Sequence, residues 1–515
     1  MLGGALALGA SYLIRVSVGG AFLPELASQT LFSLTPGSVE SVFVENLQSA
    51  AKYSAFTVGV IVNLVLYGVL GALLFRSKSI GEESGRLERL LSFVLFPYFL
   101  LAAIGIALVF LTAIQTNPVS APELLASLIL PQLVFGGVLT WFYPAVPVKH
   151  TELCEAVPPP KGRKKFDRRR RLFIEAGLAS AVGAAILVYG VGYLLRPTVA
   201  SGPGSPVTTT TLFAQDVTAN SSFYRVDVNI FPPSVAGSSW TLKVSGLVSN
   251  PLSLSLQQIQ QMGAYDQYNT LECVSNTIGG DLISTANWRG VRISDVLDMA
   301  GVQPSAEYVV FKAVDGYDVA VPMSRAMLAG AILAYEMNGA PLPAEHGYPL
   351  RAIVPGLYGM MNCKWITGIE LVSTPYQGYW QVRGWTNSAE YQTGSEIVIP
   401  GDAQVAKRFG IDGSSVVPSG AVPVAGIAFA GDRGILKVEV SADGGNTWTS
   451  ASMTEPLSNN TWIFWSSEWN PPASGHYKLV VRATDGTGAV QTAVMTDPFP
   501  NGATGYHVVD VSVSS

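Results

Sequence analysis

The sequence predicts a multi-domain fold: a helical membrane anchor with five transmembrane helices, then an α+β domain, then a C-terminal Ig-like β-sandwich. Two observations predict this order. Long apolar runs with few charges fill the first 196 residues, whereas short alternating runs separated by turn residues fill the remainder. Charged residues make up only 13% of the 515 residues, about half the share of an ordinary soluble protein. This composition excludes a single soluble domain and a disordered chain.

Five apolar runs are long enough to cross the roughly 30 Å hydrocarbon core of a bilayer. They lie at about 4–23, 55–75, 90–114, 124–147 and 172–195. Arg15 lies inside the first run, which makes that run the weakest of the five. Its side chain either has a function within the membrane or extends to the lipid head groups. The predicted membrane domain is residues 1–196.

Basic residues in the short loops predict the orientation. The loop at 148–171 contains nine Lys and Arg against three acids, and the loop at 76–89 is also rich in them, whereas 24–54 and 115–123 contain Lys52 alone. Because basic loops stay in the cytoplasm, we expect a multi-pass protein of the cell membrane, in contact with the lipid bilayer. Its amino terminus would be cytoplasmic and its C-terminal part extracytoplasmic.

The start of the last apolar run has two interpretations. Its sequence is Asp167-Arg168-Arg169-Arg170-Arg171-Leu172-Phe173-Ile174. The arginines are typical of a cytoplasmic charge anchor. The segment also resembles a twin-arginine export signal, which addresses cargo that folds before export. In that case the outer part would receive a cofactor in the cytoplasm.

Several function classes are excluded by the counts of His, Cys and charge. All four histidines, which are His150, His346, His476 and His507, lie outside the predicted spans. A haem between the helices is therefore not expected. Three cysteines cannot supply a four-thiolate iron–sulfur cluster. From residue 172 onward, 16 basic residues face 26 acids, which is the opposite of a nucleic-acid-binding surface.

The C-terminal part begins after a linker rich in Pro, Gly, Ser and Thr at 197–212. Residues 213–400 mix strand patterns, such as 240–246, with a short helical pattern at 293–299, and they form the predicted α+β domain. In residues 401–515, alternating runs at 435–441 and 477–482 are followed by Asp-Gly turns. This pattern predicts the β-sandwich.

Cys273 is the candidate metal ligand. A thiolate suits a heavy redox metal, and Gly279 and Gly280 nearby would let a bulky cofactor approach the backbone. Two other interpretations are open from the residues alone: a buried structural cysteine, or a disulfide with Cys363.

Residues 213–400 resemble the molybdopterin-binding domain of the sulfite oxidase family. The resemblance depends on many ordered motifs: Phe223-Tyr224-Arg225, Trp240 to Val248, Thr270 to Asn276, Trp288-Arg289-Gly290-Val291, Ala334 to Gly339, His346 to Arg351, Val354 to Gly359 and Lys364-Trp365. The segment Val438 to Trp448 is similar to the dimerisation domain of the family. The apolar first part resembles the anchor of membrane-bound prokaryotic members.

The resemblance implies a molybdenum–molybdopterin cofactor, with Cys273 as the sulfur ligand from the protein. It implies that His346, Arg351 and the stretch Asn362-Cys363-Lys364 hold the pterin pyrophosphate. It also implies that Tyr224, Arg225 and Asn276 line the cofactor. From the residues alone, Arg351 could instead form a surface salt bridge, and His346 could cap a turn before Gly347.

The sequence departs from sulfite oxidases where these bind an oxyanion with arginines and a tyrosine. Val226-Asp227-Val228, Thr277-Ile278 and Met361-Asn362 replace the basic positions, Trp385 takes the tyrosine position, and Arg225 and Arg383 remain. A dianion needs several cationic donors. The pattern is closer to the periplasmic methionine-sulfoxide reductase catalytic subunit. Besides Cys273, we expect Trp385 and Arg383 to act in catalysis.

The sequence therefore predicts a membrane-anchored, outward-facing molybdenum oxidoreductase. Its reaction would be two-electron oxygen-atom transfer on a small sulfoxide-like or related oxo substrate. The alternatives are a sulfite oxidase or dehydrogenase proper, and a non-enzymatic surface binding module. No haem or cluster motif is present, so a separate cytochrome or quinone-linked protein would exchange the electrons. Family analogy also suggests a homodimer.

Overall fold

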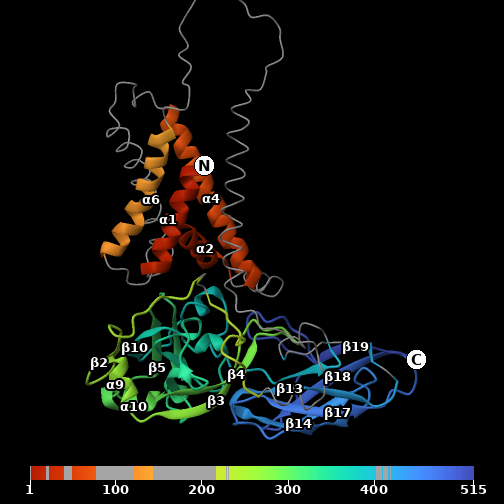
Figure 1. The fold of residues 1–515 in the computed structure, drawn as a ribbon. Coiled ribbons are helices and arrows are strands. Elements are labelled where there is room, and N and C mark those ends of the chain that lie inside the picture. Colours follow the sequence, from red (N-terminus) through yellow and green to blue (C-terminus); the bar gives the residue numbers. More distant parts are fainter. Residues whose placement is uncertain are drawn as a thin grey trace, which may run out of the picture. The chain divides into compact units, whose positions relative to one another are not determined.

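The structure is a computed structural model that describes most of the C-terminal half and four helices of the N-terminal half. The described residues are 2–18, 22–36, 38–39, 49–76, 121–142, 216–227, 229, 231–401, 409, 416–417 and 419–514. The chain divides into two compact units (Figure 1). The first comprises residues 1–34 and 50–198, and the second comprises 35–49 and 199–515.

The first unit contains helices that pack through apolar side chains. They are α1 (Leu2–Val18), α2 (Leu23–Leu34), α4 (Ser49–Arg76) and α6 (Ala121–Phe142). The rings of Tyr67 in α4 and Phe135 in α6 lie 4.8 Å apart. Gly3 and Gly4 allow α1 to approach both rings closely, because a Cβ at either position would press against Phe135 or Tyr67. Apolar side chains therefore form contacts between these helices.

Arg15 and Glu25 form a buried ion pair between α1 and α2. Arg15 Nε lies 2.7 Å from Glu25 Oε2, and its NH2 group lies 3.1 Å from Oε1. This two-point contact neutralises the arginine within the unit. The burial of the Arg15 charge is thus explained by a partner 10 residues away in the sequence. Neither of the two roles predicted for Arg15 is needed to explain it.

The predicted fold class, with its five-helix membrane anchor, is wrong. Among the helices that the structure describes, none combines the length and the apolar character that a membrane crossing requires. The first predicted span, 4–23, is not one helix, since α1 ends at Val18 and α2 begins at Leu23. Hydropathy counts apolar residues without regard to their surroundings. In α4, for example, Leu64 and Leu70 are buried, whereas Val58 and Val65 are exposed.

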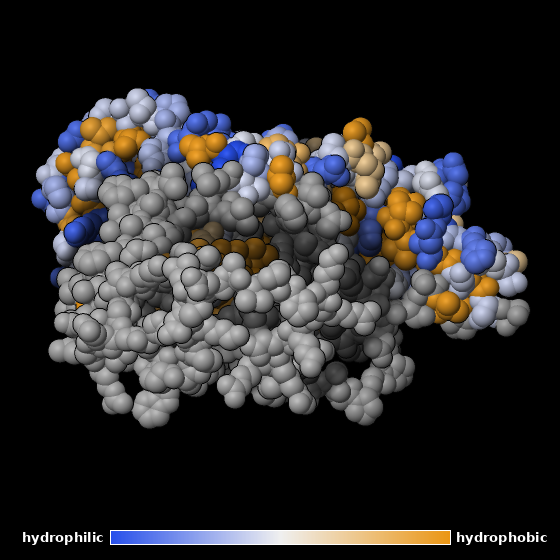
Figure 2. Space-filling model, turned by 90° about the horizontal axis from the view of Figure 1, so that it is seen from above, coloured by the Kyte–Doolittle hydropathy of each residue, from blue (hydrophilic) through white to orange (hydrophobic). Residues whose placement is uncertain are grey.

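Several predictions concern residues outside the described ranges. These are the spans at 90–114 and 172–195, the twin-arginine segment at 167–174 and the linker at 197–212. The extracytoplasmic location of the C-terminal part is untested and stays a prediction. On the described surface visible in Figure 2, hydrophobic and hydrophilic residues are interspersed.

The second unit is mostly β-structure, and its first half contains two sheets. One has the order β2 (Leu252–Ser255), β1 (Thr241–Gly246), β10 (Ile366–Val372), β5 (Tyr308–Ala313) and β6 (Asp318–Pro322). The other has the order β3 (Tyr265–Glu272), β4 (Ile283–Arg292), β7 (Ile332–Met337) and β8 (Ala340–Pro341), with β9 (Arg351–Ile353) paired to β7. Short helices connect the strands: α9 (Leu256–Gln260), α10 (Ile293–Ala300) and α11 (Met323–Ala326).

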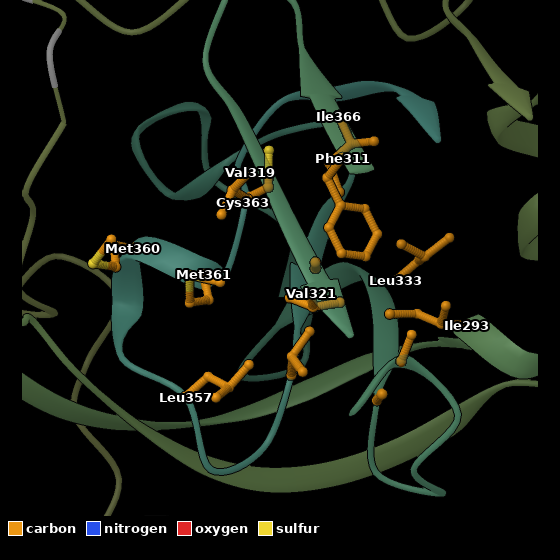
Figure 3. Packing of buried hydrophobic residues seen from close by; sticks show 14 of the residues in the cluster. Ile293, Phe311, Val319, Val321, Leu333, Leu357, Met360, Met361, Cys363 and Ile366 are labelled. Carbon is orange, nitrogen blue, oxygen red and sulfur yellow. The ribbon is translucent and has the colours of Figure 1, made fainter. Parts of the chain in front are cut away.

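One apolar core joins these two sheets. It contains Phe311 of β5, Val321 of β6 and Leu333 of β7, together with Ile293 of α10 (Figure 3). The helix α10 buries one face, formed by Ile293, Val296, Leu297 and Ala300, and ends at Gly301 with φ +67°. The left-handed conformation at that position favours glycine.

The second half of the unit consists of two sheets that share a core. One has the order β11 (Gly394–Ile399), β13 (Val422–Phe429), β17 (Ile463–Trp469) and β16 (Ser452–Met453). The other has the order β12 (Val416–Val417), β19 (His507–Val513), β18 (Gly475–Asp485), β14 (Ile435–Ser441) and β15 (Thr449–Ser450). Side chains from both sheets, including Trp465, Leu479 and Val511, fill the space between them. This packing is that of a β-sandwich.

Candidate active site

Cys273 directly follows strand β3 and begins the connection to β4. Its backbone N–H donates to the Leu282 carbonyl at 2.9 Å, and its carbonyl accepts from Asn276 N at 3.0 Å. Its side chain is buried, with Sγ 3.0 Å from Ser275 Oγ. Cys273 and Cys363 both carry thiols. The structure therefore excludes the disulfide that the sequence left open.

Asn276 closes the connection that follows Cys273. Its Nδ2 donates to Glu272 Oε1 at 3.0 Å, and its Oδ1 accepts from Leu282 N at 3.0 Å. Gly280 makes room for this amide, since a Cβ there would lie 2.4 Å from Oδ1. The sequence assigned Asn276 to cofactor binding. In the structure, both ends of its side-chain amide hold the connection itself.

The charge of Cys273 acts on four tyrosines: Tyr358 and Tyr391, which are buried, and Tyr224 and Tyr317, which are half-buried. Burial raises the pKa of every one of these phenols, and a negative charge on Cys273 raises it further. They are therefore neutral hydroxyl groups. Tyr391 Oη accepts from Glu272 N at 3.3 Å, and Tyr317 Oη donates to the Met360 carbonyl at 2.6 Å. Of the four, only Tyr224 was predicted as a site residue. Tyr358 lies in the motif Val354 to Gly359, whereas Tyr317 and Tyr391 lie outside the motifs named above.

Arg351 begins strand β9 and is buried without a carboxylate partner in the described part of the chain. Its NH1 group donates to the His346 carbonyl at 3.0 Å, and its NH2 group donates to the Asn362 carbonyl at 3.3 Å. Its guanidinium lies 4.8 Å from the ring centroid of Trp288. The Nε atom has no hydrogen-bond partner, and burial lowers the pKa of Arg351 to about 10. A buried cation with an unused donor is suited to bind an anion.

His346 lies beside Arg351 and is neutral. Its Nε2–H donates to the Asn220 carbonyl at 2.8 Å, and its ring meets the edge of Phe223 at 5.3 Å. Burial, together with the positive charges of Arg351 and two other cations nearby, lowers the pKa of His346 to about 4. The backbone N–H of Gly347 donates to the Ala344 carbonyl. His346 thus contributes shape and a hydrogen bond but no charge.

Lys364 and Arg225 share one carboxylate, that of Asp227. Lys364 Nζ lies 3.0 Å from Asp227 Oδ2, and Arg225 Nε lies 2.7 Å from the same atom. The Asp227 side chain is almost completely buried, with 4% exposed. Burial lowers the pKa of Lys364 to about 8, although Asp227 opposes this shift. Sequence reasoning treated Asp227 only as a missing basic residue and did not predict this triad.

The other two residues of the stretch 362–364 are structural. Asn362 Oδ1 accepts from Val354 N at 2.7 Å, and its Nδ2 donates to the carbonyls of Leu357 and Tyr358. Cys363 lies in the apolar core near Val319 (Figure 3), and burial raises the pKa of its thiol. Of the three residues, only Lys364 joins the charged cluster.

Trp385 and Arg383 lie in a second cluster around the short helix η4 (Gln381–Arg383). The guanidinium of Arg383 stacks 3.6 Å from the ring centroid of Tyr379 and donates to the carbonyl of the same residue. Trp385 is 6% exposed and meets Phe499 edge to face at 5.2 Å. Its Nε1–H has no acceptor among the residues that the structure describes. Tyr317 connects this cluster to the thiols, because its ring contacts Tyr379 at 5.7 Å and its pKa responds to Cys273.

The residues present fit a metal that brings most of its own ligands. Within the described ranges, no group of three or more His, Cys, Asp or Glu side chains could hold a metal ion. Cys273 supplies one thiol, and Arg351 supplies a buried cation with an unused donor. A cofactor with its own sulfur ligands and a phosphate would use both features.

Comparison with known proteins identifies the class. Residues 229–380 match the family described as "Oxidoreductase molybdopterin binding domain", and residues 385–499 match "Mo-co oxidoreductase dimerisation domain". The fold and site therefore define a molybdopterin-dependent oxidoreductase.

Individual relatives agree with this class. Mitochondrial sulfite oxidase of Rattus norvegicus is 31% identical over 297 residues, which cover 50% of this chain and 54% of that protein. The uncharacterized oxidoreductase YuiH of Bacillus subtilis is 35% identical over 146 residues, covering 28% of this chain and 72% of that protein. The crystal structure of the sulfane dehydrogenase SoxCD from Paracoccus pantotrophus has a TM-score of 0.51 at 21% identity, covering 64% and 92% of the two chains; this likeness concerns the fold alone.

The chain belongs to the sulfite oxidase family of molybdopterin oxidoreductases. It is an enzyme of that family, and its cofactor is a molybdenum cofactor. The chain spans about half the length of the mammalian sulfite oxidases that it matches.

Replacing Arg351 with Met should separate cofactor binding from stability. Arg351→Met removes the buried cation but keeps a side chain of similar length. We expect molybdenum to be lost from the purified protein, while the unfolding free energy of the cofactor-free form changes by no more than about 1 kcal/mol. Molybdenum analysis and urea denaturation measure the two effects. Arg289→Met, which breaks the half-exposed pair with Asp266, is the control and should retain molybdenum. Full molybdenum content in Arg351→Met would contradict the assignment.

His346 should make the cofactor-free protein less stable as the pH falls. Its pKa is about 4 in the folded state against an ordinary value of 6.5. Between these values the unfolded state binds more protons than the folded state, so the unfolding free energy decreases as the pH is lowered through this interval. The loss amounts to about 3 kcal/mol. Urea denaturation from pH 7 to 4 should show a smaller slope in His346→Gln. His476→Gln, on the exposed face of β18, should keep the wild-type slope.

Proposed function

We propose that this enzyme catalyses two-electron oxygen-atom transfer on a small neutral oxo substrate, with a sulfoxide as the model. The observation that carries the proposal is the Nε1–H of Trp385, a buried donor without an acceptor. The oxygen atom of a sulfoxide is a strong hydrogen-bond acceptor, and it would satisfy this donor. Reduction of a sulfoxide consumes two electrons and two protons, and releases a thioether and water.

The charges around the site favour a neutral substrate over sulfite. Arg225 and Lys364 already share the carboxylate of Asp227. Arg383 stacks on Tyr379 and donates to its backbone. A dianion would need several cations to replace its hydration. Sulfite oxidation is nevertheless the second candidate, because a rat sulfite oxidase is among the relatives at 31% identity.

The residues of the site have distinct roles in this proposal. When bound, the molybdenum cofactor supplies the redox chemistry and the acceptor for the oxygen atom. Cys273 provides one sulfur ligand from the end of β3. Arg351 binds the phosphate of the cofactor, and neutral His346 orients the same region. Trp385 holds the substrate oxygen. The neutral phenol of Tyr317 connects the Trp385 cluster with the region of Cys273.

A substrate screen with two variants tests the reaction. Purified protein is assayed for sulfoxide reduction with reduced benzyl viologen, and for sulfite oxidation with ferricyanide. Trp385→Phe should lower kcat/KM for the sulfoxide about tenfold, the value of one hydrogen bond at the site, at unchanged molybdenum content. Cys273→Ser should abolish activity. Trp448→Phe, at the surface of the sandwich, should behave like the wild type.

Two results would contradict the proposal. One is sulfite oxidation without sulfoxide reduction, which would favour the second candidate. The other is a Trp385→Phe variant with unchanged kinetics on every substrate, which would remove the donor role of Trp385.

Electrons for this reaction would come from a separate protein. The sequence contains no Cys-x-x-Cys-His motif for covalent haem and only three cysteines. The proposal therefore includes a cytochrome or a quinone-linked protein as the partner. The acidic balance of the C-terminal part would favour a basic carrier. The segment at 167–174 supports placing this exchange outside the cytoplasm.

The proposal also includes a homodimer. Residues 385–499 match the dimerisation domain. A run of exposed residues near its end includes three large apolar side chains, Val490, Val494 and Met495, which are 54%, 67% and 65% exposed. Such a group of apolar residues on a surface favours contact with another protein.

Placing charges in this run should separate the dimer. The double change Val494→Asp and Met495→Asp puts two carboxylates into the proposed contact, where burial would be costly. We expect the mass measured by light scattering to fall from that of a dimer to that of a monomer. Met327→Asp, on the first half of the unit, should leave the mass unchanged. A double variant that remains dimeric would place the contact elsewhere.

A further inference from the structure

Strand β3, which ends at Glu272 directly before Cys273, lies at the edge of its sheet. In the order β3-β4-β7-β8, only one side of β3 pairs with another strand of that sheet. The backbone groups on the other side need partners from elsewhere. The C-terminal sandwich supplies them through the segment 458–462. Thr270 N donates to the Asn460 carbonyl at 2.9 Å, and Ser458 Oγ donates to the Tyr268 carbonyl at 2.7 Å.

A second contact from the sandwich is made by His507, the first residue of β19. Its Nδ1 accepts from Ile397 N of β11 at 2.9 Å, which fixes the imidazole between the two sheets of the sandwich. The far side of the ring lies against Gly279. A Cβ at Gly279 would be 2.5 Å from Nε2 and 2.9 Å from Cδ2. Gly279 also has φ +71°, so two independent constraints require glycine there.

Gly279 and Cys273 belong to the same short connection. Asn276 bonds to Glu272 at the start of the connection and to Leu282 at the end of the connection. These bonds close the connection into one loop. The imidazole of His507 therefore supports the outer side of the loop that carries Cys273. The segment 458–462 holds strand β3, which leads into this loop. Both supports come from residues more than 180 positions later in the sequence.

We propose that the C-terminal sandwich forms part of the metal site, with His507 as a positioning residue that holds the Cys273 connection through Gly279. The proposal rests on the role of Cys273 as the metal ligand. A thiolate must be held within about half an ångström for productive metal geometry. The two contacts supply that restraint from the sandwich, of which residues 385–499 match a family described as a dimerisation domain and His507 follows that match.

His507→Asn tests the contact with Gly279 separately from the sandwich. The Oδ1 atom of Asn can replace Nδ1 as the acceptor for Ile397 N, whereas the part of the ring that contacts Gly279 is removed. We expect the melting temperature of the full-length protein to stay close to that of the wild type. The Mo(V) electron paramagnetic resonance signal of the loaded protein should change in g-values. In cofactor-free protein, alkylation of Cys273 by iodoacetamide should accelerate about threefold or more as the connection opens more often.

Two internal controls accompany this variant. Cys363, buried in the core, serves as the reference thiol, and its alkylation rate should not change. His476→Asn alters an exposed histidine of the same sandwich, bonded to Ser512, and should leave both the signal and the Cys273 rate unchanged. If His507→Asn does not fold, Ser458→Ala removes the hydroxyl that donates to the Tyr268 carbonyl and accepts from Asn460 N, and it should increase the Cys273 rate in the same direction.

The outcomes separate this inference from the proposed function. Wild-type g-values and a wild-type Cys273 rate in both His507→Asn and Ser458→Ala would overturn the positioning role. A wild-type protein whose spectrum shows no thiolate on molybdenum would instead overturn the role of Cys273. A changed rate at Cys363 as well as Cys273 would indicate general loosening and would also overturn the inference.

Discussion

The site depends on one buried guanidinium that lacks a carboxylate partner among the described residues. Arg351 is held by two backbone carbonyls and by the face of Trp288, yet its Nε–H is unused. Burying such a cation is costly unless an anion completes it. The first half of the second unit thus carries an electrostatic strain that binding of a phosphate-bearing cofactor would relieve. Burial is the main reason why the pKa of His346 is lowered, and the charge of Arg351 adds to this effect.

The thiol and the cation are delivered by different parts of one sheet. Cys273 follows β3 at its edge, and Arg351 begins β9 beside β7. Burial raises the pKa of Tyr224, a negative charge on Cys273 raises it further, and the positive charge of Arg351 lowers it. A Cβ at Gly359 would lie 2.3 Å from the Tyr224 hydroxyl, so the loop that follows β9 leaves space for it. The sheet therefore fixes the separation of the two groups that a bound cofactor would connect.

The sequence predicted the family, the cofactor and several residues that the structure brings together. These predictions were possible because ordered motifs, such as those around Cys273 and Arg351, can be read directly from the sequence. It failed where the answer depends on partners distant in the chain. The apolar runs of α1 and α4 predicted membrane spans, since hydropathy does not record what a side chain packs against. The cofactor-binding roles of Asn276 and Asn362 stay predictions. In the structure, the amide of Asn276 bonds to Glu272 and Leu282, and the amide of Asn362 bonds to backbone groups of nearby residues.

Asp227 has a consequence beyond its local contacts. One carboxylate serves both Arg225 and Lys364, so the net charge of three side chains is decided at a single position. A substitution there would remove the shared partner of both cations, together with the acceptor for the backbone N–H of Asn229. A change at this one codon could thus alter whether the enzyme accepts uncharged or doubly negative molecules. The position is therefore a simple point for evolutionary change in substrate range.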